Sequence, residues 1–282
     1  MNKNNNLKPE DYLEPNCVLC DKPIGTKPKQ ESIPQQRISI KLDELMGKKE
    51  FNNAEILLKN WLNEAITYND KQGEFFIYNE MMGYYRKVKR QLEAYEVVDK
   101  ALKMMPELNY LDSISGATAY TNGATVYTAF EDYEKALTLF DKAKIIYENN
   151  IEANEYKLAG LYNNMSTCLT SLKRYDEAND LYFKAITLLK SIDGGELELA
   201  MIYLNIIDIY LSKDELLENS DKIDEYLNIA KDYLESDNLE RNTYYSFMAD
   251  KCVNIYEYFG WFKYAKILRN RIEEIDERAR IS

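Results

Sequence analysis

The sequence contains no histidine and only four cysteines in 282 residues. Without histidine, the Ser-His-Asp and Cys-His catalytic arrangements and a His-Glu-x-x-His zinc site are excluded. Four scattered cysteines do not make a disulfide framework, so we expect reduced thiols. The sequence also has no glycine-rich loop that could cradle phosphate groups. We therefore expect neither enzyme activity nor a cofactor.

A basic surface is missing as well, because Lys and Arg total 36 against 48 Asp and Glu, a formal charge of −12. Nucleic acids and anionic membranes are bound through clustered positive charge, so we expect neither as a partner. No stretch approaches the roughly 20 apolar residues that cross a bilayer. The first residues also lack the apolar core of a signal peptide. These absences favour a cytoplasmic location.

Proline is scarce beyond the first 34 residues, which hold five of the six prolines. Because proline blocks helix interiors, residues 1–35 are predicted to form a flexible leader. This segment contains Cys17 and Cys20 in a Cys-x-x-Cys spacing. Such a pair is half of a structural zinc site, which needs four ligands, and no second pair lies nearby. We expect no metal there, with a shared zinc site or a redox pair as alternatives.

What the sequence does contain is an internal repeat. Tyrosines recur 42, 42 and 41 residues apart, and pairs of alanines recur in the same register. The recurring positions are Tyr78, Tyr120, Tyr162 and Tyr203, then Ala94, Ala136 and Ala178, then Ala101, Ala143 and Ala185. Such regular recurrence predicts a stacked repeat architecture, in which each unit buries its apolar stripe against the next.

Each repeat is predicted to be a pair of amphipathic helices with one shared seam. The spacing i, i+4, i+7 marks one helix face and is found in Tyr120, Ala124 and Tyr127 and again in Ala136, Phe140 and Ala143. Short breaks at 130–132 and 173–174 separate the two helices of a pair. Most tyrosines, and Cys252, fall at seam positions, which favours a role in core packing.

The pattern of tyrosine in one helix and alanine, aromatic and alanine in the next resembles the tetratricopeptide repeat family. Pro106 looks like the proline that closes such a repeat. Units near 42 residues are longer than the usual 34 and are similar to the repeats of kinesin light chains and of bacterial peptide-sensing regulators. The resemblance implies an all-α, right-handed superhelical solenoid of antiparallel helix pairs. It would span residues 36–282 in about six pairs, ending in a capping helix.

In such arrays the first helix of each pair lines the concave surface. Polar residues off the seam of the first helices are therefore the candidate partner-binding residues: Asn79, Arg86, Thr121, Asn122, Thr125, Asn163, Asn164, Thr167, Ser171, Asn205 and Asp208. An asparagine amide can bond both polar groups of an extended peptide backbone. Asn122, Asn164 and Asn205 would form a ladder, as asparagines do in kinesin-light-chain-type repeats. The alternative is that these are ordinary solvated side chains.

The sequence thus leaves several functions open. We favour a protein- or peptide-binding adaptor that holds its partner in the concave groove. The alternative is an intracellular peptide-sensing regulatory protein that lacks a DNA-binding domain of its own, since the proline-rich leader resembles neither a helix-turn-helix nor a helical bundle. A third possibility is a homo-oligomer that assembles through an exposed terminal repeat.

Overall fold

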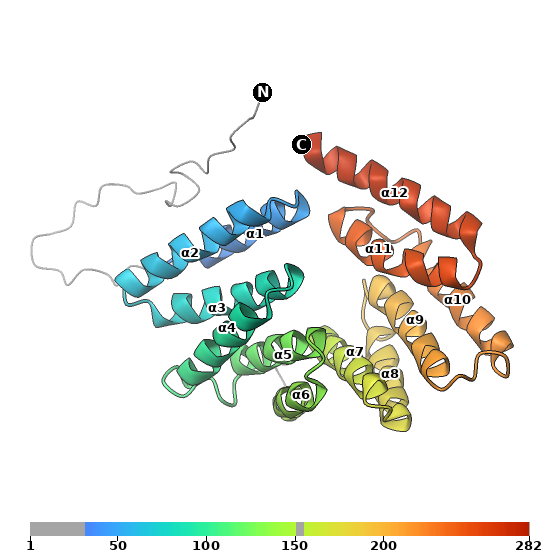
Figure 1. Ribbon diagram of the computed structural model, residues 1–282, viewed down its shortest axis with the longest axis horizontal. Coiled ribbons are helices and arrows are strands. Elements are labelled where there is room, and N and C mark those ends of the chain that lie inside the picture. The colour runs from blue at the N-terminus through green and yellow to red at the C-terminus, as the bar shows by residue number, and fades with distance from the viewer. Residues whose placement is uncertain (1–31, 151–154, 282) are drawn as a thin grey trace, which may run out of the picture. The chain divides into compact units, whose positions relative to one another are not determined.

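The computed structural model describes residues 32–150 and 155–281 (Figure 1). Over these residues the chain forms twelve α-helices and no strand, which confirms the predicted all-α class. The chain divides into two compact units, residues 1–130 and 131–282, and each is considered by itself. Residues 1–31 of the predicted leader, with Cys17 and Cys20, lie outside the described residues, and the first helix begins within the predicted leader, at Gln35.

The first unit contains α1 (Gln35–Gly47), α2 (Phe51–Thr67), α3 (Lys71–Lys87), α4 (Gln91–Met104) and α5 (Ile114–Ala129). The second contains α6 (Tyr133–Asn149), α7 (Glu155–Ser171), α8 (Tyr175–Leu189), α9 (Glu196–Ser212), α10 (Ser220–Leu234), α11 (Thr243–Tyr258) and α12 (Phe262–Ile281). Within each unit most successive helices pack against each other, and turns of three residues join α1 to α2, α2 to α3, α3 to α4 and α7 to α8. The predicted breaks at 130–132 and 173–174 are confirmed, and Pro106 follows the end of α4 as expected.

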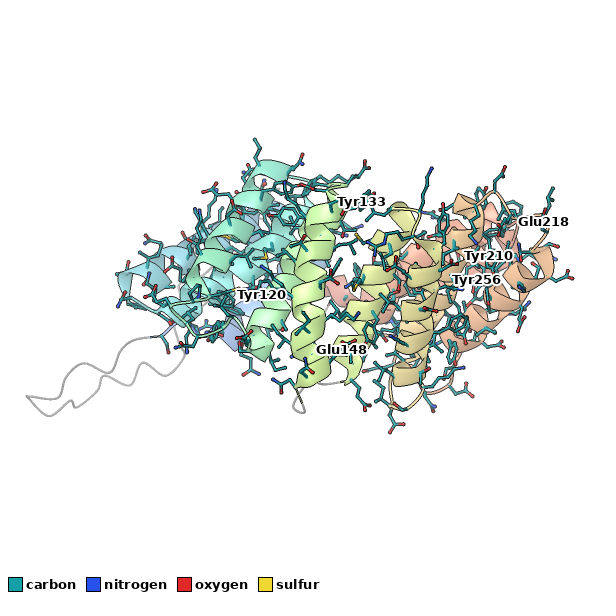
Figure 2. All side chains as sticks on the ribbon, turned by 90° about the horizontal axis from the view of Figure 1, so that it is seen from below. Tyr120, Tyr133, Glu148, Tyr210, Glu218 and Tyr256 are labelled. Carbon is teal, nitrogen blue, oxygen red and sulfur yellow. The ribbon has the colours of Figure 1, made fainter. Side chains whose placement is uncertain are left out.

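The recurring tyrosines and alanines form the core of each unit. Tyr78, Tyr120 and Tyr162 are each 6% exposed and Tyr203 is 7% exposed, while the recurring alanines are fully buried. Phe140 is also fully buried, and Figure 2 labels two of the core residues, Tyr120 and Tyr256. Because alanine has no side chain beyond Cβ, the helix axes come close at these points and the aromatic rings fill the space between them. The seam predicted from the 42-residue spacing is confirmed.

The turns inside five of the helix pairs place a non-glycine residue in the left-handed region, and the turn between α11 and α12 places Gly260 there. Lys89 has φ 58° between α3 and α4, and Lys173 has φ 61° between α7 and α8. In both turns the next amide closes the helix end: Arg90 N donates to the carbonyl of Tyr85 and Arg174 N to that of Leu169, each across 2.9 Å. This six-to-one bond satisfies a carbonyl that the helix end leaves free. The turn geometry therefore recurs with the repeat.

Side-chain caps fix where two of the first helices begin. Asp70 is buried, and its Oδ1 accepts from Gly73 N across 2.9 Å at the start of α3. Its other oxygen, Oδ2, accepts from Ile33 N across 3.0 Å, which ties the chain before α1 to α3. At the start of α5, Ser113 Oγ accepts from Gly116 N across 3.1 Å. The bonds from Gly73 N and Gly116 N each satisfy an amide that the first turn of the helix leaves free.

The last helix, α12, is apolar on one side. It buries Tyr264, Ala265, Leu268 and Ile275 and exposes lysine, arginine and glutamate on its other sides. In the neighbouring α11, Cys252 is 1% exposed, which confirms its predicted role in core packing, and burial raises the pKa of its thiol to about 12. Within the described residues, no helix combines the length and the apolar character that crossing a membrane requires.

Candidate functional site

The first helices of successive pairs lie side by side within each unit, and the second helices pack behind them. In the first unit α3 contacts α5, and both contact α4. In the second unit α9 contacts α7 on one side and α11 on the other, while α8, α10 and α12 pack against these three helices. One side of the first helices is thus left uncovered by its own unit. We call these two surfaces the first-unit face (on α3 and α5) and the second-unit face (on α7, α9 and α11).

On the first-unit face, two asparagines bridge neighbouring helices. Asn122 Nδ2 on α5 donates to Asn79 Oδ1 on α3 across 3.2 Å. Asn79 in turn donates from its own Nδ2 to the carbonyl of Phe75 across 3.0 Å, one turn earlier in α3. Both side chains are half-buried. The pair is therefore held in one orientation, with the carbonyl oxygen and the second N–H of Asn122 left for another group.

Two adjoining depressions follow this pair along the first-unit face. One has a volume of about 180 Å³ and is lined by Asn79, Glu80, Gly83, Arg86, Asn122 and Thr125. The other, of about 300 Å³, shares Asn79, Glu80 and Asn122 and extends to Phe76 and Thr118 among others. Because three residues line both, the two depressions form one open cleft. Of the predicted residues of this unit, Asn79, Arg86, Asn122 and Thr125 line the cleft, and Thr121 does not.

Two charged groups lie in the cleft. Ser39 Oγ donates to Glu80 Oε1 across 3.3 Å, and burial together with the nearby Asp43 raises the pKa of the Glu80 carboxyl. Arg86 is exposed, and among the described residues no carboxylate lies within ion-pair distance of its guanidinium. The cleft therefore carries an acid, Glu80, and a cation, Arg86, which lies six residues or nearly two helical turns further along α3.

The threonines of α5 use their hydroxyl hydrogens within the helix. Thr121 Oγ1 donates to the carbonyl of Ala117 and Thr125 Oγ1 to that of Asn122, each across 2.8 Å. On α7 of the second unit, Thr167 Oγ1 donates to the carbonyl of Asn163 across 3.1 Å and Ser171 Oγ to that of Thr167 across 3.2 Å. These hydroxyls keep lone pairs free and so present acceptors rather than donors to a partner.

The second-unit face repeats the asparagine bridge. Asn205 Nδ2 on α9 donates to Asn163 Oδ1 on α7 across 2.9 Å. In both units the donor lies two residues after a seam tyrosine and the acceptor lies one residue after the preceding one. Asn164, the residue that sequence spacing pairs with Asn205, is half-buried beside this bond. The two bridges place amide groups at equivalent positions on both faces.

Asp208 lies one turn after Asn205 on α9. It is half-buried, and burial raises the pKa of its carboxyl to about 6. Near it, Thr167 Oγ1 and the hydroxyl of Tyr182 are 3.2 Å apart, and the Asp208 charge is one cause of the raised pKa of Tyr182. The carboxylate is therefore near enough to Tyr182 to influence its hydroxyl, and among the described residues it has no ion-pair partner.

Sequence spacing missed a group of three residues on the second-unit face, which we call the tyrosine–glutamate cluster: Tyr156 on α7, Glu198 on α9 and Tyr244 on α11. Both tyrosine hydroxyls donate to Glu198 Oε1, and the two hydroxyl oxygens are 3.4 Å apart. Burial, with the contact to Glu198, raises the pKa of Tyr244 to about 12 and also raises the pKa of Tyr156. Glu198 lies seven residues before Asn205, a helical spacing that could have indicated a shared face.

Comparisons with known proteins agree with this architecture. Residues 115–191 match the sequence profile described as tetratricopeptide repeat. A crystal structure of BtubC (BKLC) from P. vanneervenii is similar in fold, with a TM-score of 0.59 at 20% identity over 71% of this chain and 81% of that chain. At this identity the likeness concerns the fold alone.

Two curated relatives, both called clustered mitochondria protein homolog, match by sequence. The one from Candida albicans is 26% identical over 171 residues, which is 60% of this chain and 12% of the relative. The one from Debaryomyces hansenii is 28% identical over 123 residues, which is 42% of this chain and 9% of the relative. The matched part is thus about a tenth of the length of these relatives.

Proposed function

Because residues 115–191 are tetratricopeptide repeats and helix pairs continue on both sides of them, we propose that this chain is a scaffold that holds an extended peptide of a protein partner. Tetratricopeptide repeats mediate protein–protein interaction, and the peptide would lie on the first-helix faces. The observation that carries the proposal is the asparagine bridge, which is present in each unit with the same geometry.

The bridges suit an extended peptide backbone. Each residue of such a peptide offers one N–H donor and one C=O acceptor. Asn122 keeps its Oδ1 and one N–H free after bonding Asn79, so it can meet both groups of one peptide residue. The threonine hydroxyls beside it add acceptors for further peptide N–H groups. Each such bond contributes about 0.5–1.5 kcal/mol, so affinity would come from several together.

The bridges also reduce the free-energy cost of binding. An asparagine that is free to rotate loses side-chain entropy when a peptide fixes it, at about 0.5–1.5 kcal/mol for each side chain that is immobilised. Asn79 is already fixed by its bond to the carbonyl of Phe75, and Asn122 is fixed by its bond to Asn79. The amide groups are therefore oriented before the partner arrives. The open cleft around them leaves room for peptide side chains.

The proposal is tested by affinity capture from native cytosol, with the wild-type chain and the triple variant Asn122→Ala, Asn164→Ala and Asn205→Ala as baits. A matched control replaces three exposed asparagines on second helices, Asn52, Asn60 and Asn228, by alanine. We expect that some partner proteins are captured by the wild type and by the control variant but not by the test variant. The affinity of the partner's binding segment for each of the three proteins is then measured by calorimetry.

Circular dichroism of each variant shows whether the helices are intact, since exposed or half-buried substitutions of this kind cost less than about 1 kcal/mol each. If the test variant captures the same partners with the same affinity as the wild type, the asparagine bridges do not hold the partner and the proposal is wrong.

A further inference from the structure

The tyrosine–glutamate cluster leaves one carboxylate oxygen without a partner. Glu198 Oε1 accepts from both tyrosine hydroxyls, whereas Oε2 is shielded from solvent and accepts no hydrogen bond from any described residue. A buried acceptor that lacks a donor costs about 1–3 kcal/mol, more when it is charged. A donor from a ligand that carries positive charge would remove this cost.

Aromatic side chains lie on the same face, because Tyr156 and Tyr244 contact this carboxylate and Phe247 lies one helical turn after Tyr244 on α11. The Tyr244 and Phe247 side chains are each 46% exposed and that of Tyr156 is 36% exposed, although large aromatic residues are normally buried in this chain. An ammonium or guanidinium group is attracted to the face of such a ring. Lys251 of α11 shows that these rings can accept one, because its Nζ lies 4.1 Å from the centroid of the Phe247 ring.

A second carboxylate without an ion pair lies further along α9. Asp208 is ten residues after Glu198, which is about 15 Å along a helix at 1.5 Å per residue. The intervals from Glu198 to Asn205 and on to Asp208 are seven and three residues, so all three lie on one side of α9. Asn205, which holds the asparagine bridge, therefore lies between the two carboxylates.

We propose that the second-unit face binds an extended peptide with two basic side chains, one held by Glu198 beside Tyr156 and Tyr244 and the other held by Asp208. This rests on the proposed peptide-binding function and names the class of partner. An extended chain covers about 3.3–3.6 Å per residue, so the two basic residues are four or five positions apart. The formal charge of −12 on the whole chain adds a longer-range attraction for such a peptide.

The experiment selects binders from a phage-displayed library of random dodecapeptides on the immobilised full chain. The same selection is made on the double variant Glu198→Gln, Asp208→Asn and on the control Glu148→Gln. Glu148 is a matched control because it also accepts a tyrosine hydroxyl, that of Tyr162 across 2.7 Å, but lies at the C-terminal end of α6 (Figure 2). Glutamine at position 198 keeps an acceptor for both tyrosines, so the cluster remains closed.

We expect peptides from the wild type and from Glu148→Gln to be enriched in Lys and Arg at four- or five-residue spacing, and peptides from the double variant to lose this enrichment. In calorimetry with one selected peptide, each single substitution at Glu198 or Asp208 weakens binding about tenfold, which corresponds to about 1.4 kcal/mol. Lys251→Ala strengthens it about twofold to threefold, because a competing cation leaves the Phe247 ring.

Selected peptides without enrichment in basic residues, or an enrichment that the double variant keeps, would overturn the inference. The outcome remains distinct from that of the proposed function. Peptides that lack basic residues but lose affinity for Asn163→Ala and Asn205→Ala would support peptide binding and refute the assignment of Glu198 and Asp208. Peptides that bind all of these variants equally would refute both.

Discussion

The side-chain amide of Asn205 donates to Oδ1 of Asn163 across 2.9 Å, and Asn122 donates to Asn79 in the same way across 3.2 Å in the other unit. The two bonds differ in one respect. Asn79 is fixed by a further bond to the carbonyl of Phe75, whereas the Asn163 side chain donates no hydrogen bond to any residue that the structure describes. A reversed Asn79 amide therefore loses the bond to Phe75 as well as the bridge, whereas a reversed Asn163 amide loses only the bridge.

This difference predicts unequal effects of aspartate. Asn122→Asp places a carboxylate oxygen against Asn79 Oδ1, so we expect the free energy of unfolding to fall by about 1 kcal/mol. Asn205→Asp should cost clearly less, because the Asn163 amide can turn its NH₂ group toward the new carboxylate. Urea denaturation at pH 7 measures both, with the two alanine variants as controls. Equal losses for the two aspartate variants would contradict the pinned orientation of Asn79.

Asp208 is predicted to lower stability at neutral pH. Its pKa in the folded chain is about 6, against 3.8 for the ordinary group, so the folded state disfavours the charged form. The contribution of Asp208 to stability is fully present below about pH 4 and is lost as pH rises through about 6. We expect Asp208→Asn to raise the free energy of unfolding by roughly 1–2 kcal/mol at pH 7 and to change it little at pH 4.

Urea denaturation at pH 4, 5, 6 and 7 checks this prediction. Asp180→Asn is the control, since Asp180 is an exposed carboxylate on α8. A constant difference between Asp208→Asn and the wild type across this pH range would show that the carboxylate is not destabilised by burial. A stabilising substitution that weakens peptide binding would be the usual exchange of stability for function at a binding site.

The left-handed turn residues offer a stabilising substitution. Lys173 adopts φ 61°, a conformation that costs a residue with a Cβ atom roughly 1 kcal/mol and costs glycine nothing. We expect Lys173→Gly to raise the free energy of unfolding by about 0.5–1 kcal/mol. Lys190 ends the next helix at φ −71°, so Lys190→Gly should lower it, because glycine loses more backbone entropy on folding. Denaturant titration measures the free energy of unfolding of both variants. If both substitutions stabilise the chain, the positive φ of Lys173 is not the reason.

The buried thiols should be protected from modification. Cys168 is fully buried and Cys252 is 1% exposed, and burial raises the pKa of Cys252 to about 12. In a variant in which Cys17 and Cys20 are replaced by serine, we expect a thiol reagent at pH 8 to react at least about a hundredfold more slowly with the native chain than with the chain in urea. Rapid labelling of the native chain would show that the seam around α7 and α11 opens readily.

Much of the fold could be predicted because one spacing determined it. Tyr78, Tyr120 and Tyr162 recur at a fixed interval, and an interval of that length brings the same helix face back to the same side of a stack. The helix breaks followed from the loss of apolar periodicity at 130–132 and 173–174. The recurring left-handed turn was not predicted, because lysine and aspartate at those positions do not carry the signal that glycine would.

The candidate site was predictable only in part. The stripe of asparagines on the first helices followed from their distance to the seam tyrosines. Which asparagines bond depends on the offset between neighbouring helices, and for this reason Asn205 meets Asn163 although spacing pairs it with Asn164. The contact of Tyr156 and Tyr244 with Glu198 joins three repeats through unlike residues, so no recurring residue type marks it.

The contacts of Glu198 determine how short a fragment of the chain can be while it still contains both hydrogen-bond donors to this carboxylate. One carboxylate oxygen takes its two donors from the helices on either side, α7 and α11. A fragment that ends before α11 or begins after α7 lacks one of those donors. The Glu198 carboxylate then keeps only one of its two hydrogen bonds. The shortest excised segment that preserves the cluster therefore runs from residue 155 to residue 258, whichever other repeats are trimmed away.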